Sequence, residues 1–410
     1  MNDAHEPRDT AETQTKRGRS GADGTRPPRP PRAATGGRGA GRTLGRARRS
    51  LNRRAARAAK GFVNGLDWFL RDPEDVVGPT SWHPALQRDK LTVRRYERPD
   101  AAPRAHRSGP MATRVPVLLI PPLMVKPYIF DLTEERSFVR HLLAAGFDTY
   151  LVDFGEPDED DSRVSLDDYV LDWMPAAVDA VCAAADTERI FLTGYCMGGL
   201  FALMHTAAND DTRVAGIITI GSPIDSHKMG VLSVLSRGLH REVDFLASHI
   251  GNVPGELSSQ MFKLMSPMKQ VTRYADLFMN LYDEEYVKGF DALSAWTGNF
   301  IDYPQDAFRQ LFRDFMRDNK LKDGRFVVGA RRPEGPIVAD LAKITVPVLA
   351  FAGATDNVVR EAAVREICAA VGTADVTVRV APGGHMGVFA GRHAPASVWQ
   401  PTADWMTDHA

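Results

Sequence analysis

The sequence predicts an α/β fold: a mainly parallel, doubly wound sheet with a helical cap inserted into it. Strand-like segments alternate along the chain with segments of helical spacing. The central strand segments are apolar throughout, which indicates strands covered on both faces. Residues 226–335 break the alternation, because they are helical in texture up to the strand-like RFVVGAR at 325–331. Open α/β sheets bind ligands at the carboxyl ends of their strands, so this insertion is expected to cover the site.

The predicted elements follow one another in a regular order. We expect strands, some with their exit loops, at 91–99, 115–124, 148–155, 189–196, 214–223, 346–356 and 375–385. Helical spacing predicts helices at 137–147, 165–185, 198–208 and 360–371. Ser165 is the expected N-cap of the second helix, whose first turn is acidic, and Gly146 closes the first helix. The core is therefore expected at 61–225 and 336–410, with the cap at 226–335.

The first 60 residues differ from the rest in composition. The chain has 410 residues, of which 43% are hydrophobic and 25% charged. Residues 1–60 carry 16 Lys and Arg against 5 Asp and Glu, whereas the remainder carries 35 against 47. This Arg/Gly/Pro-rich tail buries too little apolar surface to offset its chain entropy, so we expect it to be disordered. Its charge favours nucleic acid, an anionic surface or an acidic partner, and a solvated tail without a partner is the alternative.

Hydropathy and cysteine usage indicate a cytoplasmic protein. No apolar run reaches the length of a membrane span, and the N-terminus lacks the apolar segment of a secretory signal. The three cysteines, Cys182, Cys196 and Cys368, are too scattered for a disulfide framework and lack the spacing of metal ligands. We therefore expect reduced thiols and no bound metal.

The segment Gly194-Tyr195-Cys196-Met197-Gly198 fits the pattern G-x-nucleophile-x-G, with a strand before it and a helix after it. Such a turn is sharp enough to strain the backbone of the nucleophile, and the two glycines let strand and helix approach each other. The N-terminus of the helix favours a thiolate. A buried, inert cysteine is the alternative. With both flanking elements in place, the pattern predicts an α/β-hydrolase fold with Cys196 as the nucleophile.

This nucleophile needs a base and an acid that orients it, in the chain order nucleophile, acid, histidine. His385 lies in PGGHMGVF, a Gly-rich loop directly after a strand, whereas His393 is expected at the surface. Two acids compete for the third role. Asp356 ends the strand VLAFAGATD in the commoner position and is the predicted acid, and Asp225 follows the strand before it. Asp153 precedes the nucleophile, so we expect a structural role for it.

Backbone N–H groups are expected to stabilise the oxyanion. The N–H of Met197 follows from the motif itself. A second donor should come from the loop after the strand VPVLLI. Pro121 and Pro122 have no N–H, so Leu123 is the first residue of that loop that can donate.

The choice of cysteine rather than serine bears on the reaction. A thiol exchanges with a thioester at almost no cost in free energy, so it can accept an acyl group from a carrier such as coenzyme A and pass it on. Water competes poorly if the cap keeps the site dry. The chemistry therefore favours acyl transfer, and a thiol hydrolase of the same fold remains the alternative.

Several motifs resemble those of the polyhydroxyalkanoate synthases. They are GYCMGG at the turn, PPLMVKPYIFDL, FDTYLVDFGEPDEDD and SLDDYVLDW before it, and PGGHMGVF after it. The cap segments NVPGELSSQMFKLMSPM, DEEYVKGFDALSAW and AFRQLFRDFMRDNKL are similar too, so the resemblance covers about residues 85–410. The short region around DKLTVRRYERP is closest to the class III synthases, whose catalytic subunits work with a second, non-catalytic subunit.

The resemblance implies a reaction and a set of roles. The reaction is transfer of 3-hydroxyacyl groups from coenzyme A onto a growing polyester, with release of free coenzyme A and no metal or redox cofactor. Cys196 is implied as the thiol that carries the chain, His385 as the base, and Asp356 as the residue that helps to activate the incoming hydroxyl. The family usually has His-[Ile/Leu]-Val-Pro after this Asp, whereas this chain has NVVR. That departure bears on site electrostatics or chain preference.

Partners and rival functions complete the expectations. The implied partners are 3-hydroxyacyl-CoA, the polyester chain, a second non-catalytic subunit, a second copy of this chain and a granule surface. The Met and aromatic residues of the cap fit a dimer contact or, in the preferred interpretation, the core of the cap itself. A cysteine-dependent hydrolase or acyltransferase for one small ester or thioester is the alternative enzyme. A non-enzymatic granule or nucleic-acid binder is the alternative of another class.

Overall fold

The computed structural model describes residues 77–98, 115–230, 251–264, 276–330 and 332–410, together with Lys60, Ser233, Val234, Gly238, His249 and Tyr274. All of these residues belong to one unit, Arg57–Ala410. The predicted tail 1–60 lies outside the described residues apart from Lys60, as does part of the predicted cap. Among the described residues, no helix has both the length and the hydropathy needed to cross a membrane.

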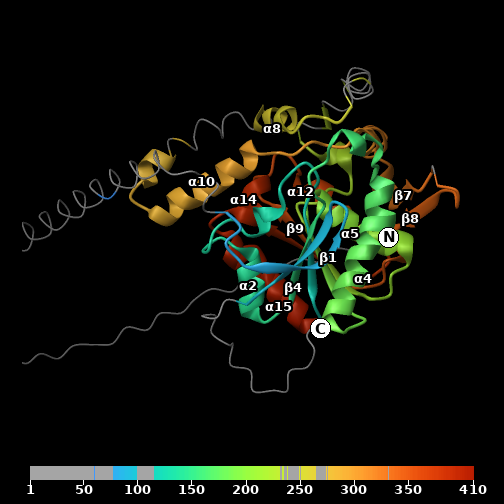
Figure 1. Ribbon diagram of the computed structural model, residues 1–410, viewed down its shortest axis with the longest axis horizontal. Helices are drawn as coiled ribbons and strands as arrows, with labels where there is room; N and C mark the ends of the chain where they lie inside the picture. Colours follow the sequence, from blue (N-terminus) through green and yellow to red (C-terminus); the bar gives the residue numbers. More distant parts are fainter. Residues whose placement is uncertain are drawn as a thin grey trace, which may run out of the picture. The chain divides into compact units, whose positions relative to one another are not determined.

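Within the described part of the chain, an eight-stranded sheet in the order β1-β2-β4-β3-β5-β6-β9-β10 forms the centre (Figure 1). Strands β4, β3, β5, β6, β9 and β10 run parallel, whereas β2 pairs antiparallel with both β1 and β4. The strands are β1 Trp82–Arg88, β2 Leu91–Tyr96, β3 Val117–Ile120, β4 Thr149–Asp153, β5 Ile190–Tyr195, β6 Val214–Ile220, β9 Val348–Gly353 and β10 Val376–Ala381. The mainly parallel sheet is the one that the apolar segments predict.

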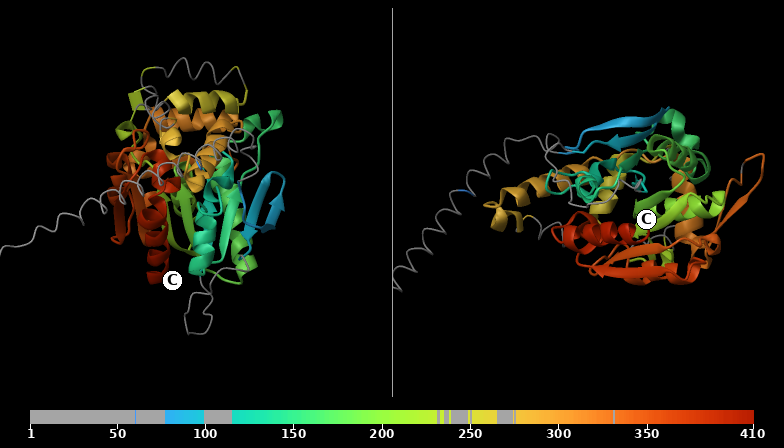
Figure 2. Two further views of the ribbon diagram at one scale, coloured as in Figure 1. Left: turned by 90° about the vertical axis from the view of Figure 1, so that its left-hand side faces the viewer. Right: turned by 90° about the horizontal axis from the view of Figure 1, so that it is seen from below.

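Helices cover both faces of this sheet (Figure 2), so the core is doubly wound as predicted. One face carries α3 Leu166–Asp168, η4 Tyr169–Trp173, α4 Met174–Ala185, α5 Met197–Asn209, α12 Glu361–Arg365 and α13 Ile367–Ala370. The other face carries α2 Phe138–Ala145, α14 His385–Ala390, η9 Pro395–Trp399 and α15 Gln400–Asp408. Each face has its own hydrophobic cluster, as exemplified by Phe201 in the first and by Phe138 and Phe389 in the second.

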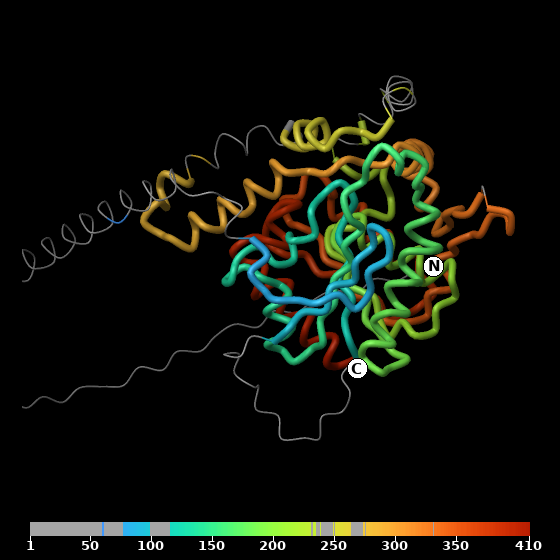
Figure 3. Tube along the Cα trace, in the orientation of Figure 1, coloured from blue at the N-terminus to red at the C-terminus, as the bar shows by residue number. Residues whose placement is uncertain are grey.

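The cap follows β6 and crosses one end of the sheet, as the yellow and orange helices in Figure 3 show. Its described helices are α8 Gly255–Leu264, α10 Glu284–Gly298 and α11 Gln305–Gln310. The Trp296 indole N–H donates to the Lys126 carbonyl at 2.8 Å, which fastens α10 to the loop after β3. Strands β7 Arg325–Val328 and β8 Ile337–Asp340 form a separate antiparallel pair that straddles the predicted boundary between residues 335 and 336.

Short helical turns complete the described chain. They are η2 Pro127–Phe130, η3 Glu159–Arg163, η5 Ser226–Lys228, η6 Leu311–Arg317, η7 Lys320–Asp323 and η8 Leu341–Lys343. The predicted capping at 165 is present, because the Asp168 carboxylate accepts the Ser165 backbone N–H and hydroxyl, both at 2.8 Å. Gly146 ends α2 with a φ of 93°. The predicted helix 360–371 is divided into α12 and α13, and His385 begins a helix instead of lying in a loop.

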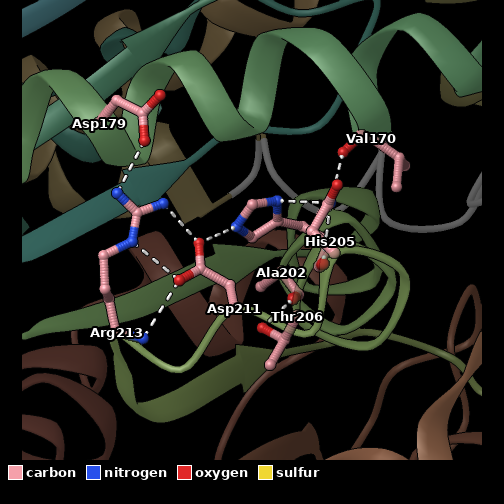
Figure 4. Close-up of polar contacts among 8 residues, drawn as sticks. Val170, Asp179, Ala202, His205, Thr206, Asp211 and Arg213 are labelled. Carbon is pink, nitrogen blue, oxygen red and sulfur yellow. Dashed lines mark hydrogen bonds and ion pairs between the residues drawn. The ribbon is translucent and has the colours of Figure 1, made fainter.

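A buried polar cluster fastens the far end of α5, the helix that starts at the nucleophile turn (Figure 4). The His205 ring is fully buried and its Nε2 lies 3.1 Å from an Asp211 carboxylate oxygen. The Asn209 amide nitrogen lies 3.1 Å from Nδ1 of the same ring. Arg213 also donates to Asp211 at 2.9 and 2.8 Å. Burial by itself raises the pKa of Asp211, but the bonds from His205 and Arg213 outweigh burial and hold this pKa well below its usual value.

Asp211→Asn is expected to destabilise the fold by about 2–3 kcal/mol at pH 7, because the variant loses a buried charge that Arg213 and His205 satisfy. The lowered pKa of Asp211 means that this contribution is present above pH 4 and is lost as pH falls further. Thermal unfolding at pH 7 and at pH 3.5 would measure the difference in stability between Asp211→Asn and the unmodified chain. This difference should be smaller at pH 3.5. Asp179→Asn removes the exposed partner of the same Arg213 and should cost less than about 0.5 kcal/mol.

Candidate active site

The turn at Cys196 has the geometry that the motif predicts. Strand β5 ends at Tyr195 and α5 begins at Met197, and Cys196 between them has φ 51° and ψ −115°. A non-glycine residue in this region is strained. The turn is held from the end of β6, because the Cys196 N–H donates to the Ile220 carbonyl at 2.8 Å and the Ser222 hydroxyl donates to the Cys196 carbonyl at 2.6 Å. These bonds offset the strain.

The two turn glycines are required by close backbone approach. A Cβ at position 194 would lie 2.2 Å from the carbonyl carbon of Gly198. A Cβ at position 198 would lie 2.0 Å from the Ile120 carbonyl oxygen at the end of β3. Gly194 and Gly198 therefore bring β5, α5 and the exit of β3 into contact at the nucleophile.

The structure places the predicted base and acid side by side. His385 Nδ1 lies 2.8 Å from one Asp356 carboxylate oxygen. The other Asp356 oxygen accepts the backbone N–H groups of Val358 and Val359 at 2.8 and 2.9 Å. Both side chains are buried. Asp356 is thus fixed at both oxygens and orients the imidazole of His385.

The Cys196 sulfur lies close enough to the same imidazole to act on its pKa, so the three predicted residues lie together. Nδ1 is directed at Asp356, which leaves Nε2 for the sulfur. Burial lowers the pKa of His385, but the Cys196 sulfur and the Asp356 carboxylate outweigh it and raise this pKa to about 10. His385 is therefore held protonated near the sulfur at neutral pH.

Further residues that orient His385 were not predicted. The Tyr195 hydroxyl donates to the His385 carbonyl at 3.0 Å, and the two rings stack at 5.4 Å. Gly221 lies against the imidazole and has φ 62°, a backbone conformation that favours glycine. Neither Tyr195 nor Ser222 is marked by a sequence motif, because their roles arise only when β5, β6 and α14 pack together.

The competing candidates lie elsewhere. Asp225 accepts the His227 backbone N–H at 2.9 Å and the Asn319 amide at 2.8 Å, so it anchors the cap. His393 is exposed, as expected. Asp153 forms an ion pair with Arg94 and accepts the Gly155 N–H at 2.9 Å, which fits the expected structural role.

The other cysteines differ from Cys196 in their surroundings. Cys182 is buried on α4, where burial raises the pKa of its thiol. Cys368 is exposed, and all three thiols are free. No group of three His, Cys, Asp or Glu side chains among the described residues is arranged to hold a metal ion. Of the three thiols, Cys196 is the one that acts on the pKa of His385.

The predicted oxyanion donors border the same turn. Met197 is the first residue of α5, so its N–H has no partner within the helix. Leu123 lies in the loop that continues from Ile120, whose carbonyl touches Gly198. Met124 in this loop has φ 62°, a strained value of the kind found at functional sites. A pocket opens beside the loop, and its lining includes Leu123, Met124, Asp153, Tyr169, Asp302 and Pro304.

Ser222→Ala is expected to destabilise the fold by about 1–2 kcal/mol, because it removes the buried donor to the Cys196 carbonyl. Denaturant unfolding measures this loss. Thr206→Ala is the matched control, since its hydroxyl donates at 2.8 Å within α5 and away from the turn. Because the Ser222 hydroxyl holds the turn that positions Cys196, alkylation of Cys196 by iodoacetamide should be slower in Ser222→Ala and unchanged in Thr206→Ala. Equal alkylation rates in the two variants would contradict a role of Ser222 in positioning the thiol.

The fold and the turn define the chain as a member of the α/β-hydrolase fold family, whose sequence model matches residues 129–391. Within that class, the chain belongs to the family of poly(3-hydroxyalkanoate) polymerases. The PhaC subunit of this polymerase from Allochromatium vinosum is 32% identical over 346 residues, which make up 84% of this chain and 93% of the relative. The PhaC subunit from Thiocystis violacea is 29% identical, with 84% and 93% covered. These matches confirm the resemblance drawn from the motifs.

Two lipases are among the solved structures with a partial likeness. A soluble variant of monoglyceride lipase from Saccharomyces cerevisiae superposes with a TM-score of 0.48 at 13% identity, over 83% of this chain and 98% of the lipase. The monoacylglycerol lipase from Paleococcus ferrophilus has a TM-score of 0.47 at 15% identity, over 72% and 97%.

Proposed function

We propose that the chain transfers 3-hydroxyacyl groups from coenzyme A thioesters onto a growing polyester through a thioester at Cys196. The observation that carries this proposal is the hydrogen-bonded His385–Asp356 pair near the Cys196 turn in a member of the poly(3-hydroxyalkanoate) polymerase family. No resident cofactor is needed, because the thiol, the imidazole and the backbone N–H groups supply a nucleophile, a proton carrier and oxyanion stabilisation.

In the first step, the Cys196 sulfur attacks the carbonyl carbon of the substrate thioester. The N–H groups of Met197 and Leu123 receive the developing oxyanion. The bond to the sulfur of coenzyme A breaks, and the leaving thiolate takes the proton from His385 Nε2. The negative charge on Cys196 disappears as the new thioester forms, which removes a main cause of the raised pKa of His385. Acylation itself therefore prompts the imidazole to release its proton.

In the second step, neutral His385 accepts the proton of the hydroxyl that extends the chain. The hydroxyl oxygen attacks the acyl group on Cys196, an ester bond forms, and the Cys196 sulfur leaves as a thiolate beside the reprotonated imidazole. Asp356 acts through His385, because its two oxygens are occupied by Nδ1 and by backbone N–H groups. When the attacking hydroxyl belongs to the next 3-hydroxyacyl-CoA, the extended chain is a coenzyme A thioester and acylates Cys196 again by the first step. The chain thus returns to the sulfur, and free coenzyme A is released once per unit added.

The purified chain should convert 3-hydroxybutyryl-CoA into insoluble polyester with release of free coenzyme A. Polymer is measured by turbidity and by its weight after solvent extraction, and coenzyme A by thiol titration. Release of free 3-hydroxybutyrate in equal amount to coenzyme A, with no polymer, would instead establish the hydrolase alternative. Absence of any thioester turnover, with and without a second subunit from the same genome, would favour the non-enzymatic binder.

We further propose that the chain works with a second, non-catalytic subunit and forms a homodimer. The relatives carry the name of a polymerase subunit. On the cap, Met261, Phe278 and Met279 are exposed by 47%, 68% and 65%, whereas Trp296 and Phe315 are buried in the hydrophobic clusters on the two faces of the sheet. Light scattering of the chain alone and with the second subunit tests both assemblies. A monomer at all concentrations, or no gain in rate with the second subunit, would contradict them.

We also propose a cytoplasmic location at the surface of polyester granules. The reaction needs coenzyme A thioesters and leaves an insoluble product, which the enzyme must stay in contact with while the chain is attached to Cys196. Cell fractionation of a polyester-accumulating host should recover the chain with the granules. Removal of residues 1–60 would test whether the basic tail contributes to binding there or to nucleic acid.

A further inference from the structure

Tyr303 is a cap residue that reaches the nucleophile turn. It lies between α10 and α11, and its backbone forms two bonds with Val253, at 2.9 and 2.8 Å. Two residues earlier, the Ile301 N–H donates to the Met124 carbonyl at 3.1 Å, in the loop that carries Leu123. The segment 301–303 is therefore fixed on one side to the cap and on the other to the loop of the predicted oxyanion donors.

The Tyr303 hydroxyl is buried with a poor partner. The side chain is 2% exposed, and its hydroxyl oxygen lies 3.3 Å from the Met197 sulfur. A thioether is a weak acceptor, so this bond satisfies the hydroxyl only in part. Burial raises the pKa of Tyr303 well above its usual value, and Cys196 adds to the rise. The hydroxyl therefore remains a protonated donor close to the reacting sulfur.

The Tyr303 hydroxyl lies on the side of the turn where the 3-oxygen of a hydroxyacyl substrate is expected. The Met197 N–H is the predicted partner of the carbonyl oxygen, and the hydroxyl of Tyr303 contacts the side chain of the same residue. The 3-oxygen of a hydroxyacyl thioester is separated from the carbonyl carbon by two carbon atoms. Asp302 and Pro304, on either side of Tyr303, line the pocket beside the loop that carries Leu123. A substrate oxygen two carbon atoms from a carbonyl bound at the Met197 N–H can therefore approach the Tyr303 hydroxyl.

We propose that Tyr303 determines specificity by donating a hydrogen bond to the 3-oxygen of the bound hydroxyacyl group, in exchange for its weak bond to Met197. This rests on the proposed function. A site that hydrogen-bonds a substrate hydroxyl discriminates against analogues that lack it, because a buried group is then left unpaired. Tyr303 in this role selects 3-hydroxyacyl thioesters over plain acyl thioesters.

The test compares acylation of the full chain by 3-hydroxybutyryl-CoA and by butyryl-CoA, measured as the rapid burst of coenzyme A release. In Tyr303→Phe, acylation by the hydroxylated substrate should fall about tenfold, and acylation by butyryl-CoA should stay within about twofold. Tyr286→Phe removes a hydroxyl from α10 of the same cap and should leave both rates unchanged. Thermal unfolding confirms that each variant is folded.

Three outcomes would overturn the assignment. Equal losses for the two substrates would show that Tyr303 acts only through packing. Unchanged rates for both would show that its hydroxyl does not contact substrate, and a loss in Tyr286→Phe of the same pattern would make the effect unspecific. If the unmodified chain makes polymer in each of these cases, only the role of Tyr303 is wrong. If the unmodified chain releases no coenzyme A, the proposed function itself fails.

Discussion

Cys196→Ala should lower coenzyme A release from 3-hydroxybutyryl-CoA by at least about 10⁴-fold and abolish polymer, because Cys196 is the thiol that acts on His385 of the His385–Asp356 pair. Cys196→Ser keeps the size of the side chain and should also lose polymer formation, since an oxygen ester lacks the easy exchange of a thioester. Both variants should unfold at the temperature of the unmodified chain or higher, because the strained turn is otherwise intact.

The matched control is Cys368→Ala, which removes an exposed thiol and should leave the rate within about twofold. Mass spectrometry of the chain after brief exposure to substrate should show an acyl group on the peptide that contains Cys196. Acyl attachment at Cys368, or polymer from Cys196→Ala, would show that the sulfur of Cys196 is not the carrier.

Asp356→Asn should lower kcat by about 10³–10⁴-fold with little change in KM, because an amide no longer fixes the tautomer and charge of His385. The pH profile should change as well. Asp356 helps to raise the pKa of His385 to about 10, so the unmodified chain keeps its imidazolium up to that pH. Without the carboxylate the pKa of His385 falls, and the alkaline loss of acylation should move to lower pH.

Asp225→Asn is the control for this change, because Asp225 was the competing acid and the structure places it against Asn319. Its loss should lower the unfolding temperature and leave the pH profile of acylation unchanged. A shifted profile in Asp225→Asn, or an unshifted one in Asp356→Asn, would reverse the assignment of the acid. Acylation measured from pH 6 to 10.5 with each variant separates these results.

The core was predictable because its determinants are local. Apolar runs such as VPVLLI form strands wherever both faces are covered, and the G-x-nucleophile-x-G pattern specifies its own turn. Strand β1 was not predicted, because WHPALQR is an exposed edge strand with a proline and a register shift, and it lacks an apolar pattern. The break between α12 and α13 occurs at Glu366, within a segment whose helical spacing is continuous.

The catalytic residues of the candidate site could be predicted from the sequence, but the residues that hold them in position could not. The chain order nucleophile, acid, histidine selects Cys196 and His385 and restricts the acid to Asp225 or Asp356. The choice between these two acids depends on the direction in which each loop leaves the sheet. Ser222, Tyr195 and Tyr303 lie near the nucleophile only through contacts between β6, β5 and the cap. Such contacts have no periodicity or spacing in the sequence, so the structure was needed to find them.

The binding of the Asp356 carboxylate has a consequence for how this family can vary. The Asp356 oxygen that does not contact His385 accepts main-chain N–H groups two and three residues further on. These N–H groups are present whatever side chains stand at those positions. Only a proline at 358 or 359 would remove one. The replacement of the usual His-[Ile/Leu]-Val-Pro by NVVR is therefore a neutral path for evolution as far as the acid is concerned. The side chains at 357 and 360 take no part in these bonds, so laboratory libraries can randomise them while the main-chain donors to the carboxylate stay in place.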